Sequence, residues 1–245
     1  MSARLTYVGH ATIALELDGV RVLTDPVLRA RVAHLARRVP SARHEDVAEL
    51  DAVLISHAHR DHLDVPSLAR LRASCPVIVP RGHGMLLRTV FDEVIEVDEG
   101  DRVRIGALEI EATRADHDGR RVPVGRAVPA VGYLVHGTRS VYFAGDTDLF
   151  AGMRDLHEAL DVALLPVAGW GPRVPAGHLD PERAAQAARL LRPRIAVPIH
   201  WGTYAAPGSR GGDPGVAPRE FAEHVARLDP DVDVRVLEPG ASTSF

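Results

Sequence analysis

Cysteine is nearly absent from this chain, with Cys75 the single one among 245 residues. A disulfide needs two cysteines, so a small fold held together by disulfides is excluded. Any bound metal ion would be held by imidazole and carboxylate groups rather than by thiolates. A lack of disulfides is typical of reducing compartments, and we therefore expect a cytoplasmic protein.

Lysine is missing altogether, so all 29 basic side chains belong to arginine. The net charge of -4 at pH 7 and the lack of a basic run argue against sequence-independent nucleic-acid binding. No apolar run reaches the roughly 18 residues that a membrane-spanning helix needs. Residues 1–6 also lack the apolar stretch of a signal peptide. We therefore expect neither a nucleic-acid partner nor a membrane span.

The composition is otherwise that of a globular protein, with 46% hydrophobic and 25% charged residues. The chain is long enough to bury a full core, and its apolar content argues against disorder. No Gly/Ser-rich linker divides it, so we predict one domain over residues 1–245. Histidine stands out, with 13 copies against the single cysteine.

Short apolar runs alternate with turn signals along both halves of the chain. Asp18-Gly19 predicts a hairpin between strands 11–17 and 20–24, and Asp180-Pro181 predicts the start of a helix. Strands with interspersed helices in two similar halves predict an α/β fold with two sheets between helical layers. Further strands are expected at 51–56, 77–79, 93–97, 101–105, 108–113, 131–136, 140–144, 162–165, 195–199 and 232–237, helices at 66–72, 81–91, 149–160, 181–191 and 218–228, and a loop or short helix at 29–46.

One short segment concentrates metal-binding side chains: His57-Ala58-His59-Arg60-Asp61-His62. Residues two apart on an extended segment point to the same side, so His57 and His59 can hold one ion together. A turn after them would let Asp61 and His62 reach a second ion nearby. The segment follows an expected strand, which would position it rigidly. A polar loop that merely contains histidines is the alternative interpretation.

Three more candidates stand at or beyond the ends of apolar strands. A carboxylate at Asp146 could bridge two cations, with an N-cap as the alternative role. His200 places an imidazole where a buried strand ends, and a core-edge histidine is the alternative. We choose His117 over His136 because His136 and Asp146 lie at opposite ends of one hairpin, about 17 Å apart for a five-residue strand.

At this point the sequence resembles the metallo-β-lactamase-fold hydrolases, through His57-x-His59-x-Asp61-His62 followed by His117, Asp146 and His200 in that family's order. Three shorter motifs are similar to the branch that contains ascorbate-6-phosphate lactonase and N-acyl phosphatidylethanolamine phospholipase D. These motifs are Gly9-His10-Ala11-Thr12, Leu23-Thr24-Asp25-Pro26 and His200-Trp201-Gly202-Thr203.

The resemblance spans nearly the whole chain and implies a four-layer αββα sandwich with the site at the sheet edges. It also implies two divalent ions, with Zn²⁺ expected and Mn²⁺ or Fe²⁺ as alternatives. The first ion would bind His57, His59 and His117, the second Asp61, His62 and His200, and Asp146 would bridge them.

Two divalent ions roughly 3.5–4 Å apart can hold a bridging hydroxide that attacks a carbonyl carbon or a phosphorus. We therefore predict a dinuclear metal-dependent hydrolase of a small ester, lactone or phosphodiester. Asp61 could also orient the nucleophile, and His178 could protonate the leaving group, unless it is a surface histidine at a helix start. His10 and Asp25 are predicted to orient ligand imidazoles, with ordinary turn chemistry as the alternative.

The substrate is expected to be a small molecule, and the sequence leaves open whether it is anionic. Arg114, Arg120, Arg121 and Arg126 flank His117 and could bind a phosphate or carboxylate, or could simply be solvated surface charge. Residues 170–172 and 205–215 could form pocket walls or a surface insertion. The oligomeric state stays open.

Two other functions compete with hydrolysis. The first is a metal-dependent oxidoreductase on the same fold. Diiron relatives that reduce oxygen usually carry glutamate at the second position of the histidine motif, where this chain has His59. The second is a non-catalytic binding protein with a decayed site, which the complete set of expected ligand residues argues against.

Overall fold

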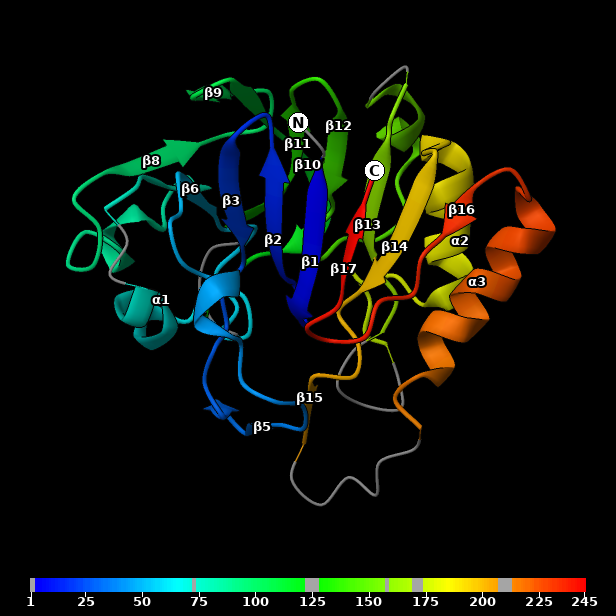
Figure 1. Cartoon of the computed structure of the whole chain (residues 1–245), viewed down its shortest axis with the longest axis horizontal. Coiled ribbons are helices and arrows are strands. Elements are labelled where there is room, and N and C mark those ends of the chain that lie inside the picture. Colours follow the sequence, from blue (N-terminus) through cyan, green and yellow to red (C-terminus); the bar gives the residue numbers. More distant parts are fainter. Residues whose placement is uncertain (1–2, 72–73, 122–127, 157–158, 169–173, 207–212) are drawn as a thin grey trace.

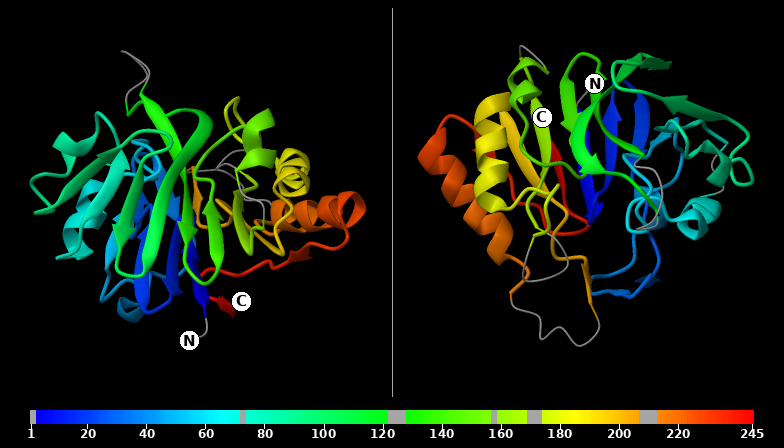
Figure 2. Two further views of the ribbon diagram at one scale, coloured as in Figure 1. Left: turned by 90° about the horizontal axis from the view of Figure 1, so that it is seen from above. Right: turned by 180° about the vertical axis from the view of Figure 1, so that it is seen from behind.

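The computed structural model describes residues 3–71, 74–121, 128–156, 159–168, 174–206 and 213–245. Two mixed sheets of seven strands lie face to face, as the views in Figure 1 and Figure 2 show together. The first sheet has the order β17-β1-β2-β3-β6-β7-β8. Its strands are β1 (Arg4–Gly9), β2 (Thr12–Leu17), β3 (Val20–Thr24), β6 (Ala52–Leu54), β7 (Val77–Pro80), β8 (Val94–Val97) and β17 (Ser242–Ser244).

The second sheet has the order β16-β14-β13-β12-β11-β10-β9. In each sheet the strands on one side pair antiparallel and those on the other side pair parallel. In the second sheet the parallel pairs start with β12 and β13. Its strands are β9 (Arg102–Ile105), β10 (Leu108–Asp118), β11 (Pro129–His136), β12 (Ser140–Phe143), β13 (Val162–Pro166), β14 (Ile195–Ile199) and β16 (Asp233–Val234). A small third sheet joins β4 (Arg31–Val32), β5 (Leu35–Arg37) and β15 (Tyr204–Ala205).

Helices cover the outer faces of the two large sheets, which makes four layers, αββα (Figure 2). Helix α1 (Val65–Leu71) packs on the first sheet, and α2 (Pro181–Leu191) and α3 (Val216–Leu228) pack on the second. The Asp180 side chain caps α2 by accepting a hydrogen bond from the Arg183 amide at 2.8 Å, as the sequence predicts. Among the described residues, no helix has the length and apolar character needed to cross a membrane.

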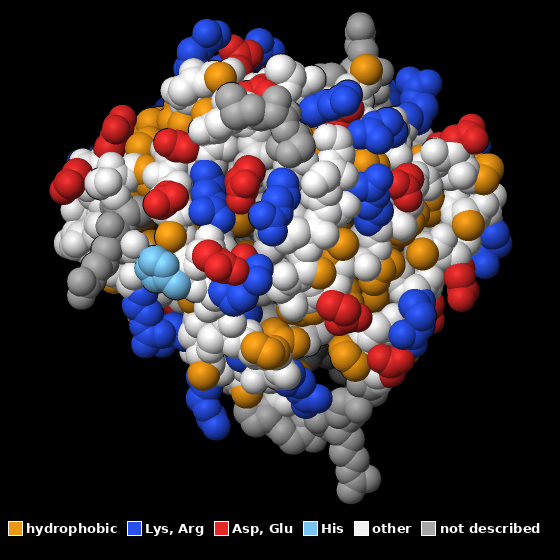
Figure 3. Space-filling model, in the orientation of Figure 1, with side chains coloured by type: hydrophobic (Ala, Val, Ile, Leu, Met, Phe, Trp, Pro, Cys, Tyr) orange, Lys and Arg blue, Asp and Glu red, His pale blue; other side chains and the backbone are white. Residues whose placement is uncertain are grey.

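The alternation of side chains along the strands explains how the core is divided. In β6 and β7, Leu54 and Ile78 face the main core between the sheets, whereas Val53 and Val77 face the cluster under α1. Both faces of these parallel strands are buried, which accounts for their continuous apolar runs. Outside the core, basic and acidic side chains are interspersed on the face that Figure 3 shows.

Two of the predicted helices are wrong. Residues 81–91 contain only the 3₁₀ turn η2 (Gly84–Leu86), because the Glu96 carboxylate binds the Gly82 and Gly84 amides and ties this loop to β8. Gly82 also has a φ of +95°, which breaks a right-handed helix. In 149–160 the described residues form only the 3₁₀ turn η3 (Ala151–Asp155).

Other boundaries also differ from the sequence prediction. Strand β10 runs on to Asp118 through an irregularity in its pairing with β11, so His117 lies on the strand rather than after it. Within 29–46 the chain forms β4, β5 and the 3₁₀ turn η1 (His44–Asp46). The strand expected at 232–237 is limited to β16, and β17, which pairs with β1, was not predicted.

The sheet topology brings chemically active residues to one edge. Parallel strands end at the same edge of their sheet, and the two sheets present these ends to each other. Asp25 follows β3, the histidine segment follows β6, Asp146 follows β12 and His200 follows β14. The edge common to the two sheets is therefore where the candidate site forms.

Candidate metal centre

The first donor group consists of three imidazoles, His57, His59 and His117. The Nδ1 atom of His59 lies 2.9 Å from Nε2 of His57 and 3.2 Å from Nε2 of His117. His57 is fully buried, whereas His59 and His117 are half-buried and line a pocket. His57 and His59 come from the segment after β6 in the first sheet, and His117 comes from β10 in the second.

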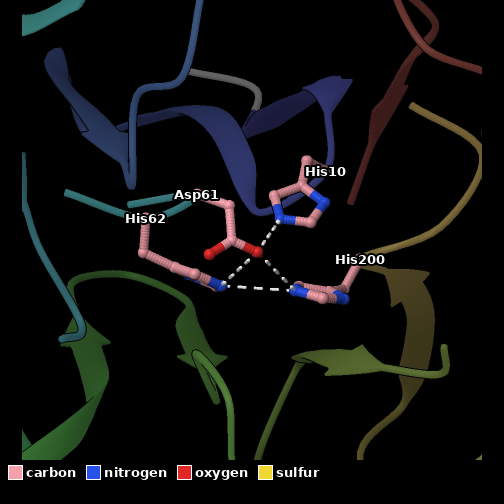
Figure 4. A group of neighbouring side chains, drawn as sticks. All are labelled: His10, Asp61, His62 and His200. Carbon is pink, nitrogen blue, oxygen red and sulfur yellow. Dashed lines mark hydrogen bonds and ion pairs between the residues drawn. The ribbon is translucent and has the colours of Figure 1, made fainter. Parts of the chain in front are cut away.

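The second donor group consists of His10, Asp61, His62 and His200 (Figure 4). Their polar atoms point toward one another, with 3.2 Å between His10 Nε2 and Asp61 Oδ2 and 3.2 Å between the Nε2 atoms of His62 and His200. Each of the three imidazoles is at most 2% exposed. This group is therefore more deeply buried than the first.

Asp146 lies between the two donor groups. Its Oδ2 atom is 3.9 Å from His57 Nε2 and 3.2 Å from His62 Nε2, and its Oδ1 atom is 3.4 Å from His200 Nε2. The residue is 2% exposed, and within the described part of the chain Oδ1 receives no hydrogen bond. A buried carboxylate oxygen without a donor is costly, and a cation would compensate it.

Asp25 and Ser56 orient ligand candidates in both groups. The Asp25 carboxylate accepts hydrogen bonds from the Ser56 amide at 2.7 Å and the Ser56 hydroxyl at 2.6 Å, and it lies 2.7 Å from Nδ1 of His62. Because the Ser56 hydroxyl proton points to Asp25, its oxygen is left to accept from Nδ1 of His57 at 3.0 Å. A single buried carboxylate thus holds one imidazole of each group, as predicted for Asp25.

These contacts leave the Nε2 lone pairs directed into the site. His117 donates from Nδ1 to the Gly177 carbonyl, and His200 donates from Nδ1 to the Ala168 carbonyl, each at 2.7 Å. Neutral imidazole carries one proton, so the Nε2 atoms of both rings are acceptors. His59 can offer only one proton to two neighbouring acceptor nitrogens. The donor set therefore fits a cation better than it fits a hydrogen-bond network alone.

Electrostatics keep most of these imidazoles neutral, as metal ligands must be. Burial lowers the pKa of His59 to about 4 and that of His200 to about 3, and it also lowers the pKa of His57 and His117. His62 differs: burial lowers its pKa, but the carboxylates of Asp146 and Asp25 raise it well above the usual range. A proton at His62 Nε2 occupies a place that a metal ion can take.

The buried carboxylates hold their charge against desolvation. Burial raises the pKa of Asp146, but His200 and His62 hold it well below its ordinary value. Burial likewise raises the pKa of Asp61, and its hydrogen bond with His10 and the charge of His62 bring it well below. Asp25, Asp61 and Asp146 thus place three buried carboxylates in one site, a charge that favours bound cations.

His178 lies beside this site. Its Nε2 atom is 3.3 Å from Oδ2 of Asp146, and its side chain is 17% exposed and lines the same pocket as His59 and His117. Burial lowers the pKa of His178, but Asp146 raises it above the usual value. His178 can therefore carry a proton at the boundary between the carboxylate and the pocket.

The rejected competitor His136 lies elsewhere, 3.8 Å from Glu111 on the neighbouring strand. Of the arginines expected to bind an anion, Arg114 lies over the Phe150 ring and Arg120 pairs with Asp118. Arg121 lines the pocket. Arg126 and the predicted pocket wall at 170–172 lie outside the described residues, as does 207–212 of the stretch 205–215.

Sequence reasoning missed Ser56 and the place of His10 among the donors. The His10 amide donates to Oγ1 of Thr203 at 2.7 Å, and the His200 amide donates to the His10 carbonyl at 2.8 Å. A Cβ at Gly9 would lie 2.9 Å from the same Thr203 oxygen. The two short motifs around His10 and His200 therefore contact each other, a relation that their sequence separation conceals.

Comparison with known proteins agrees with this fold. Residues 20–201 match the family model described as Beta-lactamase superfamily domain. A metal-dependent hydrolase of Methanopyrus kandleri is 34% identical over 254 residues, covering 98% of this chain and 98% of that protein.

Solved structures show the same architecture. A metallo hydrolase from the archaeon Ignicoccus hospitalis has a TM-score of 0.76 at 30% identity, covering 100% of this chain and 99% of that one. A diiron β-hydroxylase from Streptomyces venezuelae has a TM-score of 0.75 at 21% identity, covering 99% of this chain and 54% of that one, and shows the fold alone. The chain belongs to the β-lactamase superfamily domain family and is one of its metal-dependent hydrolases.

Proposed function

We propose that this hydrolase is dinuclear and cleaves a small ester, lactone or phosphodiester. The observation that carries the proposal is the position of Asp146 between two separate donor groups, within 4 Å of His57, His62 and His200. A mononuclear site would need only one of these groups. The second group, with its buried imidazoles and Asp61, would then have no ion to compensate its charge.

His57, His59 and His117 would hold one cation, and Asp61, His62 and His200 would hold the other, with Asp146 shared. When bound, two divalent cations supply Lewis acidity and a water nucleophile at neutral pH. The residues around them fix the donor atoms: Asp25 orients His62 directly and His57 through Ser56. Such outer contacts are typically worth 10- to 100-fold in metal affinity or activity.

His10 would support Asp61. It lies in hydrogen-bond contact with Asp61 Oδ2, and its backbone carbonyl is fixed by the His200 amide. Donation from Nε2 of His10 would hold the Asp61 carboxylate in one orientation, which suits a role of Asp61 in positioning the nucleophile. Asp61 would thus combine metal binding with orientation.

His178 would supply the proton that the leaving group needs. Its ring lies between Asp146 and the pocket, and Asp146 raises its pKa against the lowering effect of burial, which favours the protonated form. Replacement of His178 by alanine should therefore lower turnover more than metal content. Parallel loss of both would instead make His178 a metal ligand.

The test is metal analysis combined with a substrate panel. Protein purified without chelator should contain about two ions per chain, and removal of the ions should abolish hydrolysis. The panel should include lactones, phosphodiesters and thioesters of matched size. Less than one ion per chain would contradict the dinuclear proposal. Iron content together with oxygen uptake, but no hydrolysis, would instead support an oxidoreductase.

A further inference from the structure

Two arginines, Arg120 and Arg121, line the pocket beside the first donor group, and they differ in their hydrogen-bond partners. The pocket has a volume of about 370 Å³, and His59, His117 and His178 line it together with Arg120 and Arg121. Asp118 and Ala176 complete the lining. Histidines of the candidate site and two guanidinium groups therefore share one space.

The two arginines differ in their partners. Arg120 pairs with the carboxylate of Asp118, two residues earlier on the chain. Arg121 donates from Nη1 alone, to the carbonyls of Ala58 at 3.1 Å and Leu63 at 2.9 Å. Among the described residues, no carboxylate lies within ion-pair distance of Arg121, and its Nε and Nη2 atoms have no acceptor.

The surroundings of the Arg121 guanidinium disfavour its charge. Arg121 is half-buried. Burial and then the charge of Arg60 lower its pKa, whereas Asp64, whose carboxylate pairs with Arg29, raises it in part. A half-buried guanidinium that makes no direct ion pair loses solvation without full compensation. One of these carbonyls lies within the histidine segment, at Ala58, and the other directly follows it, at Leu63. The cation therefore has a fixed position relative to the candidate metal ligands.

We propose that Arg121 binds an oxyanion group of the substrate, a carboxylate or a phosphate, and so selects anionic substrates. This inference rests on the proposed hydrolase function. The Nε and Nη2 atoms form one edge of the guanidinium fork, which matches two oxygens of a carboxylate or phosphate. Because Nη1 is engaged by the backbone, that edge is oriented before the substrate enters, which reduces the entropy lost on binding.

The test compares two nitrophenyl esters with the same leaving group, the neutral acetate and the anionic hemiglutarate. In the metal-loaded protein, Arg121→Gln should lower kcat/KM for the hemiglutarate by about tenfold to a hundredfold, because a hydrogen bond to a charged group is lost. The neutral acetate offers Arg121 no anionic group, so its kcat/KM should fall much less, and the ratio of kcat/KM between the two esters should drop. An equal loss for both esters would overturn the proposal.

Two further variants control for structural damage. Arg121→Lys keeps the charge without the fork and should retain part of the preference for the anionic ester. Arg120→Gln removes a guanidinium from the same pocket that Asp118 already pairs, so the ratio between the esters should stay near the native value. A shift for Arg120→Gln as large as that for Arg121→Gln would contradict a specific role for Arg121.

A binding measurement separates this inference from the proposed function. Calorimetric titration of the metal-loaded protein with glutarate and with methylphosphonate should show about tenfold weaker binding of at least one of them to Arg121→Gln. The anion that is more affected identifies carboxylate or phosphate as the preferred group. If no member of the substrate panel is hydrolysed, the proposed function fails, yet this titration still decides the role of Arg121: unchanged affinity for both anions overturns it.

Discussion

The two donor groups meet at Asp146 but differ in exposure and in charge. The first group has imidazole donors alone, and His59 and His117 of this group line the pocket. The second group includes the carboxylate of Asp61, and its histidines are at most 2% exposed. If the proposed function holds, we expect the first group to face the substrate and the second to hold its ion in a buried, rigid position.

The two groups also differ in the hydrogen bonds that orient their histidines. His62 of the second group contacts the Asp25 carboxylate directly, and His200 donates to a backbone carbonyl. His57 of the first group depends on Asp25 only through Ser56. A charged acceptor strengthens a hydrogen bond, so the second group should hold its ion more tightly.

Asp146→Ala should have the largest effect because it removes the carboxylate that lies directly between the donor atoms of both groups. We expect hydrolysis to fall by more than about a hundredfold, beyond the loss typical of outer-shell residues, together with loss of metal. Metal analysis and turnover measure this directly. Asp148→Ala, a carboxylate in the same loop that pairs with Arg183, is the matched control and should stay close to native. Full activity of Asp146→Ala would refute the bridging role.

His117→Ala should affect the two groups unequally. It removes a donor from the first group alone, so metal content should fall from about two ions per chain to about one, with the second group still occupied. His136→Ala changes a histidine that faces Glu111 and should leave the metal content unchanged. Loss of both ions from His117→Ala would show that the groups do not bind independently.

Asp25→Ala and Ser56→Ala test the shared support. Removal of Asp25 should weaken binding of both ions by about 10- to 100-fold, since it orients a ligand in each group. Ser56→Ala should weaken ion binding by the first group and leave ion binding by the second unchanged, because His62 keeps its direct contact with Asp25. Zinc titration against a competing chelator measures both. The idea of a common support would fail if Ser56→Ala weakened both sites equally.

Acidification should give the smallest difference in metal affinity between the two donor groups, and this difference should grow gradually as the pH falls. The pKa of His62 lies above its usual value, so a proton competes with the metal there below and around neutral pH. His59 has a pKa of about 4 and stays deprotonated between pH 8 and pH 6. Lowering the pH across that range should therefore weaken the second site by up to about tenfold per unit and change the first little.

The same shifts predict how the metal-free protein responds to acid. His59 and His200 have lowered pKa values, so the unfolded chain binds more protons than the folded one below about pH 6.5. Their contribution to stability is present above that pH and is lost as the pH falls toward 4. His62 acts in the opposite direction, since its pKa is raised. Thermal unfolding at several pH values measures the net slope.

Local patterns predicted much of the fold. The Asp18-Gly19 hairpin and the capped start of α2 are confirmed, because each depends on backbone preferences of a few neighbouring residues. The helices expected at 81–91 and 149–160 are wrong. In the first of these, contacts of Glu96 with the Gly82 and Gly84 amides override local propensity, and such long-range contacts cannot be read from a short window.

The sequence by itself determined the chemistry of this protein: imidazole and carboxylate donors, clustered in one segment and repeated at later strand ends. Those residue types and their local spacing are sufficient to indicate metal binding. Tertiary structure alone decided the rest. It placed His10 beside Asp61, linked His57 and His62 through Asp25, and held Arg121 on the carbonyls of Ala58 and Leu63. These relations join residues far apart in the chain, and the meeting of the two sheets at one edge brings them into contact.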